Sequence, residues 1–308
     1  MHLAIVGAGA LGRVYGVRLA TFAGATVTFV VRPALLADGA MRIERVDGDR
    51  GAVDLARPER LAAVPHDADV VLVCVRGDQL DADLVTTLQQ GPDVPAVMLT
   101  PMMPADYTRL RAALGGRVVA AMPNVVAYAK DDGTTRYWLP GAATTLIEEA
   151  RPADATLTAL CEALDAAGIS ARQEMGVHET NPATTIAFIP LAMGLDAAGG
   201  IDALLGDEAM LDLSLRAAAE GATLAHRVGK VATWASVVLR FVGPTTLKLG
   251  VALARSRAPE AVAYVEAHFG RKLHAQNVAM ADAIVELARE RDVPHDAMIE
   301  LTARLRAR

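Results

Sequence analysis

A Gly-x-Gly-x-x-Gly turn after a short apolar segment constrains this chain more than any other feature. Residues 3–6 are apolar, Gly7, Gly9 and Gly12 follow them, and a helical pattern comes next. Strand, glycine turn and helix in this order are typical of a dinucleotide-binding unit, in which the diphosphate lies at the helix N-terminus. The alternative is a glycine turn that only joins two elements. The predicted cofactor contacts in the turn are Gly7, Gly9, Ala10, Leu11 and Gly12.

The order of apolar segments predicts an α/β fold with a second, helical domain. Strands are expected at residues 3–6, 26–31, 70–75, 96–99 and 118–122, and helices at 12–22, 78–90 and 105–114. This alternation predicts a Rossmann-type, doubly wound parallel sheet. The polar segment 41–55 suggests a small edge hairpin. Beyond about residue 174 the pattern is helical, so we expect an NADP-binding domain at 1–172 and an all-α substrate and dimerisation domain at 173–308.

Composition limits which binding partners and which cellular compartment are expected. The net charge is −6 and no basic block occurs, which argues against nucleic acid. The apolar stretches 183–195 and 231–254 are too short or too interrupted to span a bilayer, so no membrane association is expected. The two cysteines, Cys74 and Cys161, have no metal spacing and predict no disulfide framework. Since the first strand begins almost at residue 1, no signal peptide is expected, and the predicted location is cytoplasmic.

Arg32 bears on the choice of cofactor. It follows the second predicted strand, twenty residues after Gly12, where NAD-preferring folds carry an acidic residue for the ribose hydroxyls. A guanidinium can instead pair with a 2′-phosphate. The sequence therefore favours NADP over NAD, with a solvated loop arginine as the alternative interpretation.

Several segments together resemble the ketopantoate reductase family. They are the glycine turn, Val27–Arg32, Asp69–Arg76 with Asp78-Gln79, and a helical C-terminal half with a Val293-Pro294 turn before its last helix. The resemblance implies a two-domain enzyme that uses NADPH to reduce a 2-keto acid to a 2-hydroxy acid. It also implies cofactor contacts from Val75 and Arg76, where Arg76 replaces a family lysine, and from Thr100, which otherwise caps a loop.

The catalytic positions depart from the family pattern. The resemblance places a lysine early in the first helix of the C-terminal half, and the best match there is Asn181; the chain has only four lysines, at 130, 230, 248 and 272. Where the family has a late-helix glutamate, this chain has His274. An amide has no proton to give, whereas histidine titrates near neutral pH. His274 is therefore the predicted proton donor or substrate anchor, and His178 is the second candidate. For both histidines the alternative is a solvent-facing structural role.

The sequence favours an NADPH-dependent reductase with a divergent substrate. Hydride delivery to a ketone requires a proton source, whereas an iminium ion already carries its proton, so both C=O and C=N substrates remain open. A non-redox NADP-binding protein of the same fold is the other class. A homodimer is expected through the helical half.

Overall fold

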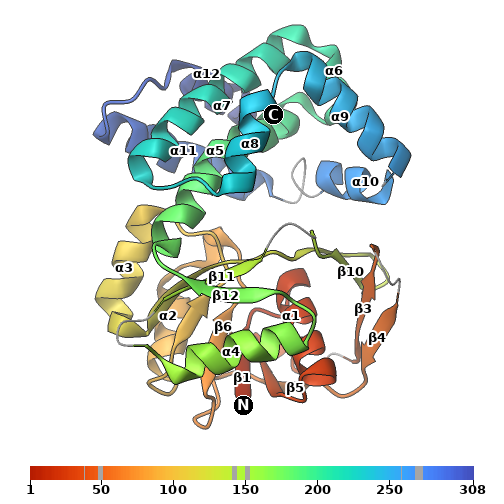
Figure 1. Cartoon of the computed structure of the whole chain (residues 1–308), viewed down its shortest axis with the longest axis vertical. Coiled ribbons are helices and arrows are strands. Elements are labelled where there is room, and N and C mark those ends of the chain that lie inside the picture. Colours follow the sequence, from red (N-terminus) through yellow and green to blue (C-terminus); the bar gives the residue numbers. More distant parts are fainter. Residues whose placement is uncertain (38, 48–50, 141–143, 150–152, 258, 268–272) are drawn as a thin grey trace. The chain divides into compact units, whose positions relative to one another are not determined.

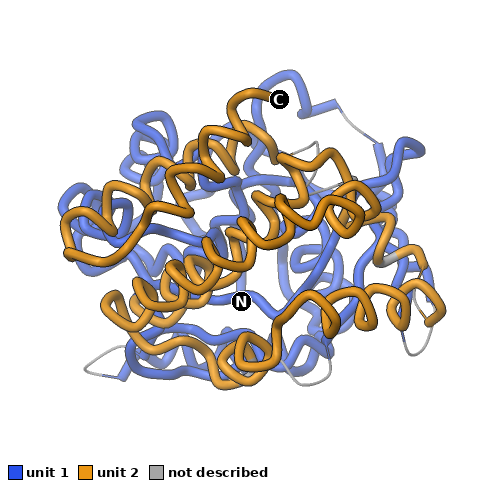
Figure 2. Tube along the Cα trace, turned by 90° about the horizontal axis from the view of Figure 1, so that it is seen from above, with its two compact units in different colours: residues 1–178 blue, residues 179–308 orange. Residues whose placement is uncertain are grey.

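The computed structural model divides the chain into two compact units, Met1–His178 and Glu179–Arg308, coloured separately in Figure 2. It describes residues 1–37, 39–47, 51–140, 144–149, 153–257, 259–267 and 273–308. Each unit is built around its own apolar core. The predicted class is confirmed: a doubly wound α/β sheet in the N-terminal unit is followed by an all-α C-terminal unit among the described residues.

The N-terminal unit contains a large sheet of eight described strands (Figure 1). In spatial order these are β12 (Ala171–Glu174), β11 (Thr145–Glu148), β8 (Val118–Met122), β7 (Ala96–Met98), β6 (Val70–Val73), β1 (His2–Val6), β2 (Thr26–Val30) and β5 (Glu59–Leu61). The strands from β8 to β5 are parallel, and β11 is antiparallel to β8. The chain runs from β1 to β2 on one side and then returns to place β6 on the other. The strand order therefore reverses between β1 and β6.

Helices cover both faces of this sheet because successive side chains of its central strands point in opposite directions. Leu3 and Ile5 pack with α1 (Ala10–Phe22) and α4 (Ala155–Ala166). Ala4 and Val6, one residue out of phase, pack with α2 (Ala82–Gln89) and α3 (Pro104–Leu114). Single-turn 3₁₀ helices connect the elements at η1 (Pro33–Leu35), η2 (Gly77–Gln79) and η3 (Gly115–Arg117).

A second sheet of four described strands packs against α1. Its strands are β4 (Ala52–Leu55), β3 (Met41–Arg45), β10 (Thr135–Trp138) and β9 (Val126–Ala129). β3 and β4 form the antiparallel pair expected from the polar segment 41–55. The buried Arg18 of α1 donates to the Tyr137 hydroxyl of β10 at 2.5 Å and to the Ala167 carbonyl at 2.6 Å. These bonds fix α1, the helix that follows the glycine turn.

The C-terminal unit begins within α5 (Val177–Ala198). The helices after it are α6 (Ile201–Gly206), α7 (Glu208–Val228), α8 (Thr233–Phe241), α9 (Pro244–Arg257), α10 (Pro259–Ala267), α11 (His274–Glu290) and α12 (Asp296–Arg306). Glu220 of α7 accepts the Ala297 and Met298 amides of α12 at 3.0 and 2.9 Å, which caps that helix. Among the described residues no single helix is long and apolar enough to span a bilayer. Ala235–Phe241 and Pro244–Arg257 meet that test together, but they bend by 118°.

Candidate functional site

The predicted cofactor residues gather at the carboxyl edge of the large sheet. Gly7 follows β1, Arg32 follows β2 closely, Val75 and Arg76 follow β6, and Thr100 follows β7. The Cys74 amide donates to the Val6 carbonyl at 2.8 Å, so β1 and β6 end side by side. This edge is the topological switch point of the sheet, where open α/β sheets bind their ligands.

The glycine turn has the shape that a diphosphate requires. Gly7 has φ +97° and its amide donates to the Val30 carbonyl at 3.3 Å, a tight turn that a side chain would strain. A Cβ on Gly12 would lie 2.0 Å from the Gly7 carbonyl oxygen, so only glycine lets α1 approach this closely. A Cβ on Gly9 would meet nothing within 4 Å. The space beside Gly9 and the unpaired amides at the start of α1 therefore suit an anionic group.

Arg32 is exposed at the residue before η1, with no side-chain cap bond to that helix. The Val31 amide before it donates to the Leu61 carbonyl of β5 at 2.9 Å, which fixes the backbone that carries Arg32. Placed there, the guanidinium is in solvent at the same sheet edge as the glycine turn. Its location suits an anionic group on the nucleotide, and it equally suits a solvated arginine.

Arg76 forms an ion pair within its own loop. Its Nε and Nη2 atoms lie 2.8 and 2.7 Å from the two carboxylate oxygens of Asp78. The hydrogen bond from Arg76 holds the pKa of Asp78 below its ordinary value, and that bond likewise raises the pKa of Arg76. The resemblance assigns Arg76 to cofactor binding. Its positive charge is partly compensated by the carboxylate of Asp78.

Thr100 and Cys74 are buried where β7 and β6 end. The buried Thr100 hydroxyl donates to the Val75 carbonyl at 2.6 Å, which ties the end of β7 to the end of β6. Burial raises the pKa of the Cys74 thiol well above its ordinary value, so this side chain stays protonated and inert. Thr100 and Cys74 are therefore structural parts of the sheet edge.

Arg13, which sequence reasoning missed, closes the glycine turn. It comes directly after Gly12 and its Nε donates to the Ala8 carbonyl at 3.0 Å. Its Nη1 donates to the Gly133 carbonyl at 3.0 Å, in the loop between β9 and β10. The usable signal was a basic residue in the first turn of the helix, where the helix dipole disfavours a cation unless an anion lies nearby.

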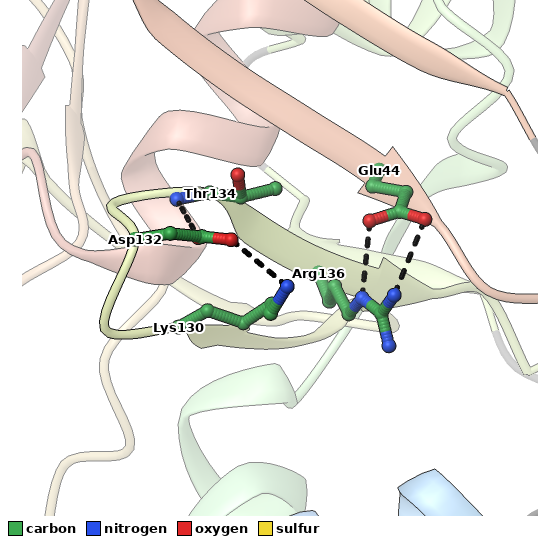
Figure 3. A network of polar contacts seen from close by, with 5 residues as sticks. All are labelled: Glu44, Lys130, Asp132, Thr134 and Arg136. Atoms are coloured by element: carbon green, nitrogen blue, oxygen red, sulfur yellow. Dashed lines mark hydrogen bonds and ion pairs between the residues drawn. The ribbon is translucent and has the colours of Figure 1, made fainter.

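The loop that Arg13 reaches is held by two ion pairs (Figure 3). Lys130 lies 2.9 Å from Asp132, which also accepts the Thr134 amide at 2.9 Å. Arg136 of β10 pairs with Glu44 of β3 through contacts of 3.0 and 3.4 Å. The small sheet therefore contacts the start of α1 through this loop.

His178 is held at the start of α5 by Glu148 of β11. The carboxylate oxygens of Glu148 accept the Gly176 amide at 2.9 Å, the His178 amide at 2.8 Å and the His178 Nδ1 at 2.9 Å. The His178 ring also stacks on Tyr107, with ring centroids 5.0 Å apart. Glu148 thus caps α5 and fixes the orientation of the histidine ring.

Asn181 lies one turn later, in the C-terminal unit. Its side chain is buried, and its Oδ1 accepts the Thr185 hydroxyl at 3.3 Å. Thr184 nearby accepts the Ala232 amide at 3.0 Å, which connects α5 to the start of α8. The position where the resemblance places a lysine is therefore a buried amide in a polar stretch of α5.

His274 is paired with a fully buried carboxylate, Asp196 of α5. The His274 Nδ1 donates to Asp196 Oδ2 at 3.0 Å, and the Asn277 amide donates to that oxygen at 2.9 Å. Arg308 pairs with Asp196 Oδ1 at 2.6 Å. The His274 side chain is part-exposed. A carboxylate hydrogen-bonded to Nδ1 orients the ring, as in other carboxylate–histidine pairs. Sequence reasoning named His274 but not Asp196.

Comparison with known proteins gives one family and one fold. Residues 3–149 match the family model "Ketopantoate reductase PanE/ApbA". A search of curated proteins finds no match to the sequence.

Solved structures of reductases and dehydrogenases share the whole fold. A PanE/ApbA family ketopantoate reductase from Ralstonia eutropha JMP134 is 20% identical, with TM-score 0.72 over 100% of this chain and 98% of that one. A dimeric ketopantoate reductase from Staphylococcus aureus is 15% identical, with TM-score 0.69 over 100% and 98%. A D-mandelate dehydrogenase solved with NADH and anilino(oxo)acetate is 15% identical, with TM-score 0.65 over 100% and 97%.

Proposed function

We propose that this chain, whose residues 3–149 form a domain of the ketopantoate reductase family, is an NADPH-dependent reductase of a C=O or C=N substrate. The observation that carries the proposal is the gathering of the glycine turn, Arg32 and Val75-Arg76 at one switch point of the sheet. The reaction class is hydride transfer to a 2-keto acid or a related carbonyl or imine. The fold neighbours are themselves oxidoreductases, which supports this class.

In this proposal the glycine turn and the first turn of α1 bind the diphosphate of the cofactor. The amides of Ala10 and Leu11 are among the helix-start donors that face an anion there. Arg32 pairs with the 2′-phosphate and so selects NADPH over NADH. When bound, the cofactor supplies the hydride. Val75 and Arg76 then contact its remaining parts beyond the end of β6.

His274 supplies the proton in this proposal. Asp196 accepts the Nδ1 hydrogen bond, so in this proposal the proton leaves from Nε2 of the part-exposed ring. A positioned acid of this kind typically contributes about 10²–10⁴-fold to a proton-transfer step. His178, fixed by Glu148, is the second candidate for the same role.

Asn181 orients the substrate in this proposal and donates no proton. An amide can hydrogen-bond to a carbonyl oxygen or a carboxylate, but it has no ionisable proton near neutral pH. A ketone therefore needs His274, whereas an iminium substrate does not. The relative solved with anilino(oxo)acetate, a carboxylate beside a carbonyl, supports the 2-keto-acid branch.

Nucleotide binding is the first test. We expect NADPH to quench the fluorescence of the purified protein, and Arg32→Ala to weaken its affinity at least tenfold, which is about 1.4 kcal/mol. NADH affinity should be unchanged by the same substitution, because NADH lacks the 2′-phosphate. Equal loss for both nucleotides would assign Arg32 a general role, and no binding of either would overturn the proposal.

NADPH oxidation distinguishes the reductase from the alternative function. The absence of a lysine at position 181 favours one alternative, an NADP-binding protein of this fold without redox chemistry. NADPH oxidation with a panel of 2-keto acids, other ketones and imines would support the reductase. Binding without oxidation of NADPH across the panel would support the alternative.

Asn181→Lys tests the placement of the missing lysine. If position 181 corresponds to the lysine of the family, the variant should gain ketopantoate reduction. A folded variant that stays inert towards ketopantoate would count against that correspondence. Asn181→Gln is the matched control, since it changes size without adding an amine.

The remaining partners in the proposal are a small molecule and a second copy of the chain, with no nucleic acid or membrane. A ketopantoate reductase neighbour is dimeric, which supports a homodimer here. Cys74 and Cys161 are both free thiols, which suits a reducing cytoplasmic location. Sedimentation velocity on the purified chain tests the oligomeric state directly.

A further inference from the structure

Helices α8 and α9 expose a concentration of large apolar side chains. Of the twelve exposed large hydrophobic residues among those the structure describes, five lie on these two helices. Phe241 is 66% exposed and Leu249 is 68% exposed. The five are Val237, Val238, Phe241, Leu249 and Leu253. A cluster of this kind marks an interaction surface far more often than isolated exposed residues do.

A groove lies beside these side chains within the C-terminal unit. Its volume is about 500 Å³, and its walls come from α6, α8, α9 and α10. Thr246 is its polar wall residue, but its hydroxyl bonds to the Gly243 amide at 2.8 Å and to the Phe241 carbonyl at 2.6 Å. That hydroxyl therefore serves the turn between α8 and α9. The wall of the groove is therefore apolar.

Basic and acidic residues lie on different helices beside the groove. Residues 229–259, which include α8 and α9, contain five basic residues and no acidic one. On the other flank, α6 carries Asp202 and α10 carries Glu260 and Glu266. Arg255 of α9 already pairs with Asp202 of α6 at 2.7 Å within one chain. Basic and acidic edges thus meet across this groove.

We infer that this α8–α9 surface, defined by the five exposed residues and the groove beside them, is where a second copy of the chain binds. Projecting apolar side chains and an apolar groove lie on the same surface, so a twofold axis can seat the side chains of each copy in the groove of the other. The same operation faces the basic α9 with the acidic edge of α6 and α10. An isologous interface needs this self-complementarity.

Other occupants satisfy fewer of these features. A small apolar molecule would fill the groove and leave Phe241, Leu249 and Leu253 in water. A lipid surface would accept the apolar side chains and the basic residues, but α8 and α9 bend by 118° and acidic residues flank them. Only a second copy uses the projections, the groove and both charged edges.

The inference rests on the homodimer proposed above and is independent of hydride transfer. Sedimentation velocity over a concentration series should show a dimer for the natural chain. Leu249→Glu and Leu253→Glu should each weaken dimerisation by at least about thirtyfold, the effect of losing a hot-spot residue of about 2 kcal/mol. Ile299→Glu, at an exposed apolar residue of α12, is the matched control and should leave the dimer intact.

The outcomes separate the possibilities. A natural chain that stays monomeric overturns both the dimer and this inference. A dimer that both α9 variants leave unchanged overturns this surface but keeps the dimer. A monomer that binds vesicles of anionic phospholipid, with binding lost in Leu249→Glu, would assign the surface to lipid. Unchanged NADPH affinity and circular dichroism in the variants shows that each is folded, whatever the fate of the reductase proposal.

Discussion

Gly9 and Gly12 lie in the same turn but have different reasons to be glycine. A Cβ on Gly12 would collide with the Gly7 carbonyl oxygen, whereas a Cβ on Gly9 would enter open space. Gly12→Ala should therefore lower the melting temperature and abolish NADPH binding together. Gly9→Ala should keep the melting temperature of the natural chain and lose affinity only, because its methyl group enters the space beside the turn.

Thermal unfolding followed by circular dichroism, together with nucleotide titration, measures both effects. The pair is its own control, since each variant adds the same methyl group to the same turn. If Gly9→Ala bound NADPH as tightly as the natural chain, the diphosphate would not lie beside Gly9.

His274 should affect turnover and leave cofactor affinity alone. If it donates the proton, His274→Gln should reduce kcat for a ketone by about 10²–10⁴-fold. NADPH affinity should not change, because the proposed nucleotide contacts all lie in the N-terminal unit. His226→Gln, in the last turn of α7, is the matched control. A variant that keeps the kcat of the natural chain would move the acid elsewhere, first to His178.

Residue identity was enough to name His274 as a candidate, but it gave no information on the surroundings of that residue. Histidine chemistry and its position before Val293-Pro294 were visible in the sequence. Asp196, its partner, lies 78 residues earlier, and nothing in the spacing indicates that a carboxylate in α5 faces the start of α11. Long-range pairs of this kind depend on helix packing, which local pattern does not encode.

The β9–β10 loop gives a pH prediction at the scale of an element. The hydrogen bond from Lys130, with the Thr134 amide, lowers the pKa of Asp132 from 3.8 to about 2. Because the native pKa is below the unfolded one, the contact stabilises the loop above pH 3.8 and is lost as the pH falls through about 2. Carboxyl NMR titration should show this midpoint, and Lys130→Ala should raise it. A midpoint near 3.8 in the natural chain would contradict the geometry in Figure 3.

At the scale of elements, apolar strands were predictable and polar or short ones were not. β2, β6, β7 and β8 lie within the predicted segments and β1 begins one residue before its own, because continuous Val, Ile and Ala runs are typical of buried parallel strands. The sequence Ala-Arg-Gln-Glu of β12 has no such signal, since its pairing with β11 at the sheet edge leaves side chains exposed. The helix expected over 78–90 is divided into η2 and α2, because Asp81 caps the Leu84 amide at 2.9 Å.

At the scale of the whole molecule, the resemblance to ketopantoate reductases is confirmed over residues 3–149 by the family match, and the fold is shared over the full length of the chain. The edge at which the strands end was predictable, because alternating strands and helices give parallel strands whose carboxyl ends share one edge. The pairing of each charged side chain was not. Arg76 with Asp78 and Arg13 with Gly133 depend on loop conformations that only the folded chain sets.

Cofactor binding should stabilise the molecule unevenly. NADPH at a hundred times its Kd should raise the unfolding free energy of the unit that binds it by about 2.7 kcal/mol. If the two units unfold separately, calorimetry should show one transition that moves with NADPH and one that does not. The shift should vanish in Gly9→Ala. A shift of the same size in that variant would place the nucleotide outside the glycine turn.

The contacts of Asp196 bear on which unit can fold first during synthesis. Its partners His274, Asn277 and Arg308 are 78, 81 and 112 residues further along. A ribosome therefore releases α5 long before anything can neutralise this carboxylate, and during that interval the carboxylate has to stay in water. The described strands of both sheets have all been synthesised once residue 174 is added. On this route the sheet unit can form before the helical unit closes, because Asp196 is paired only after residues 274–308 are made.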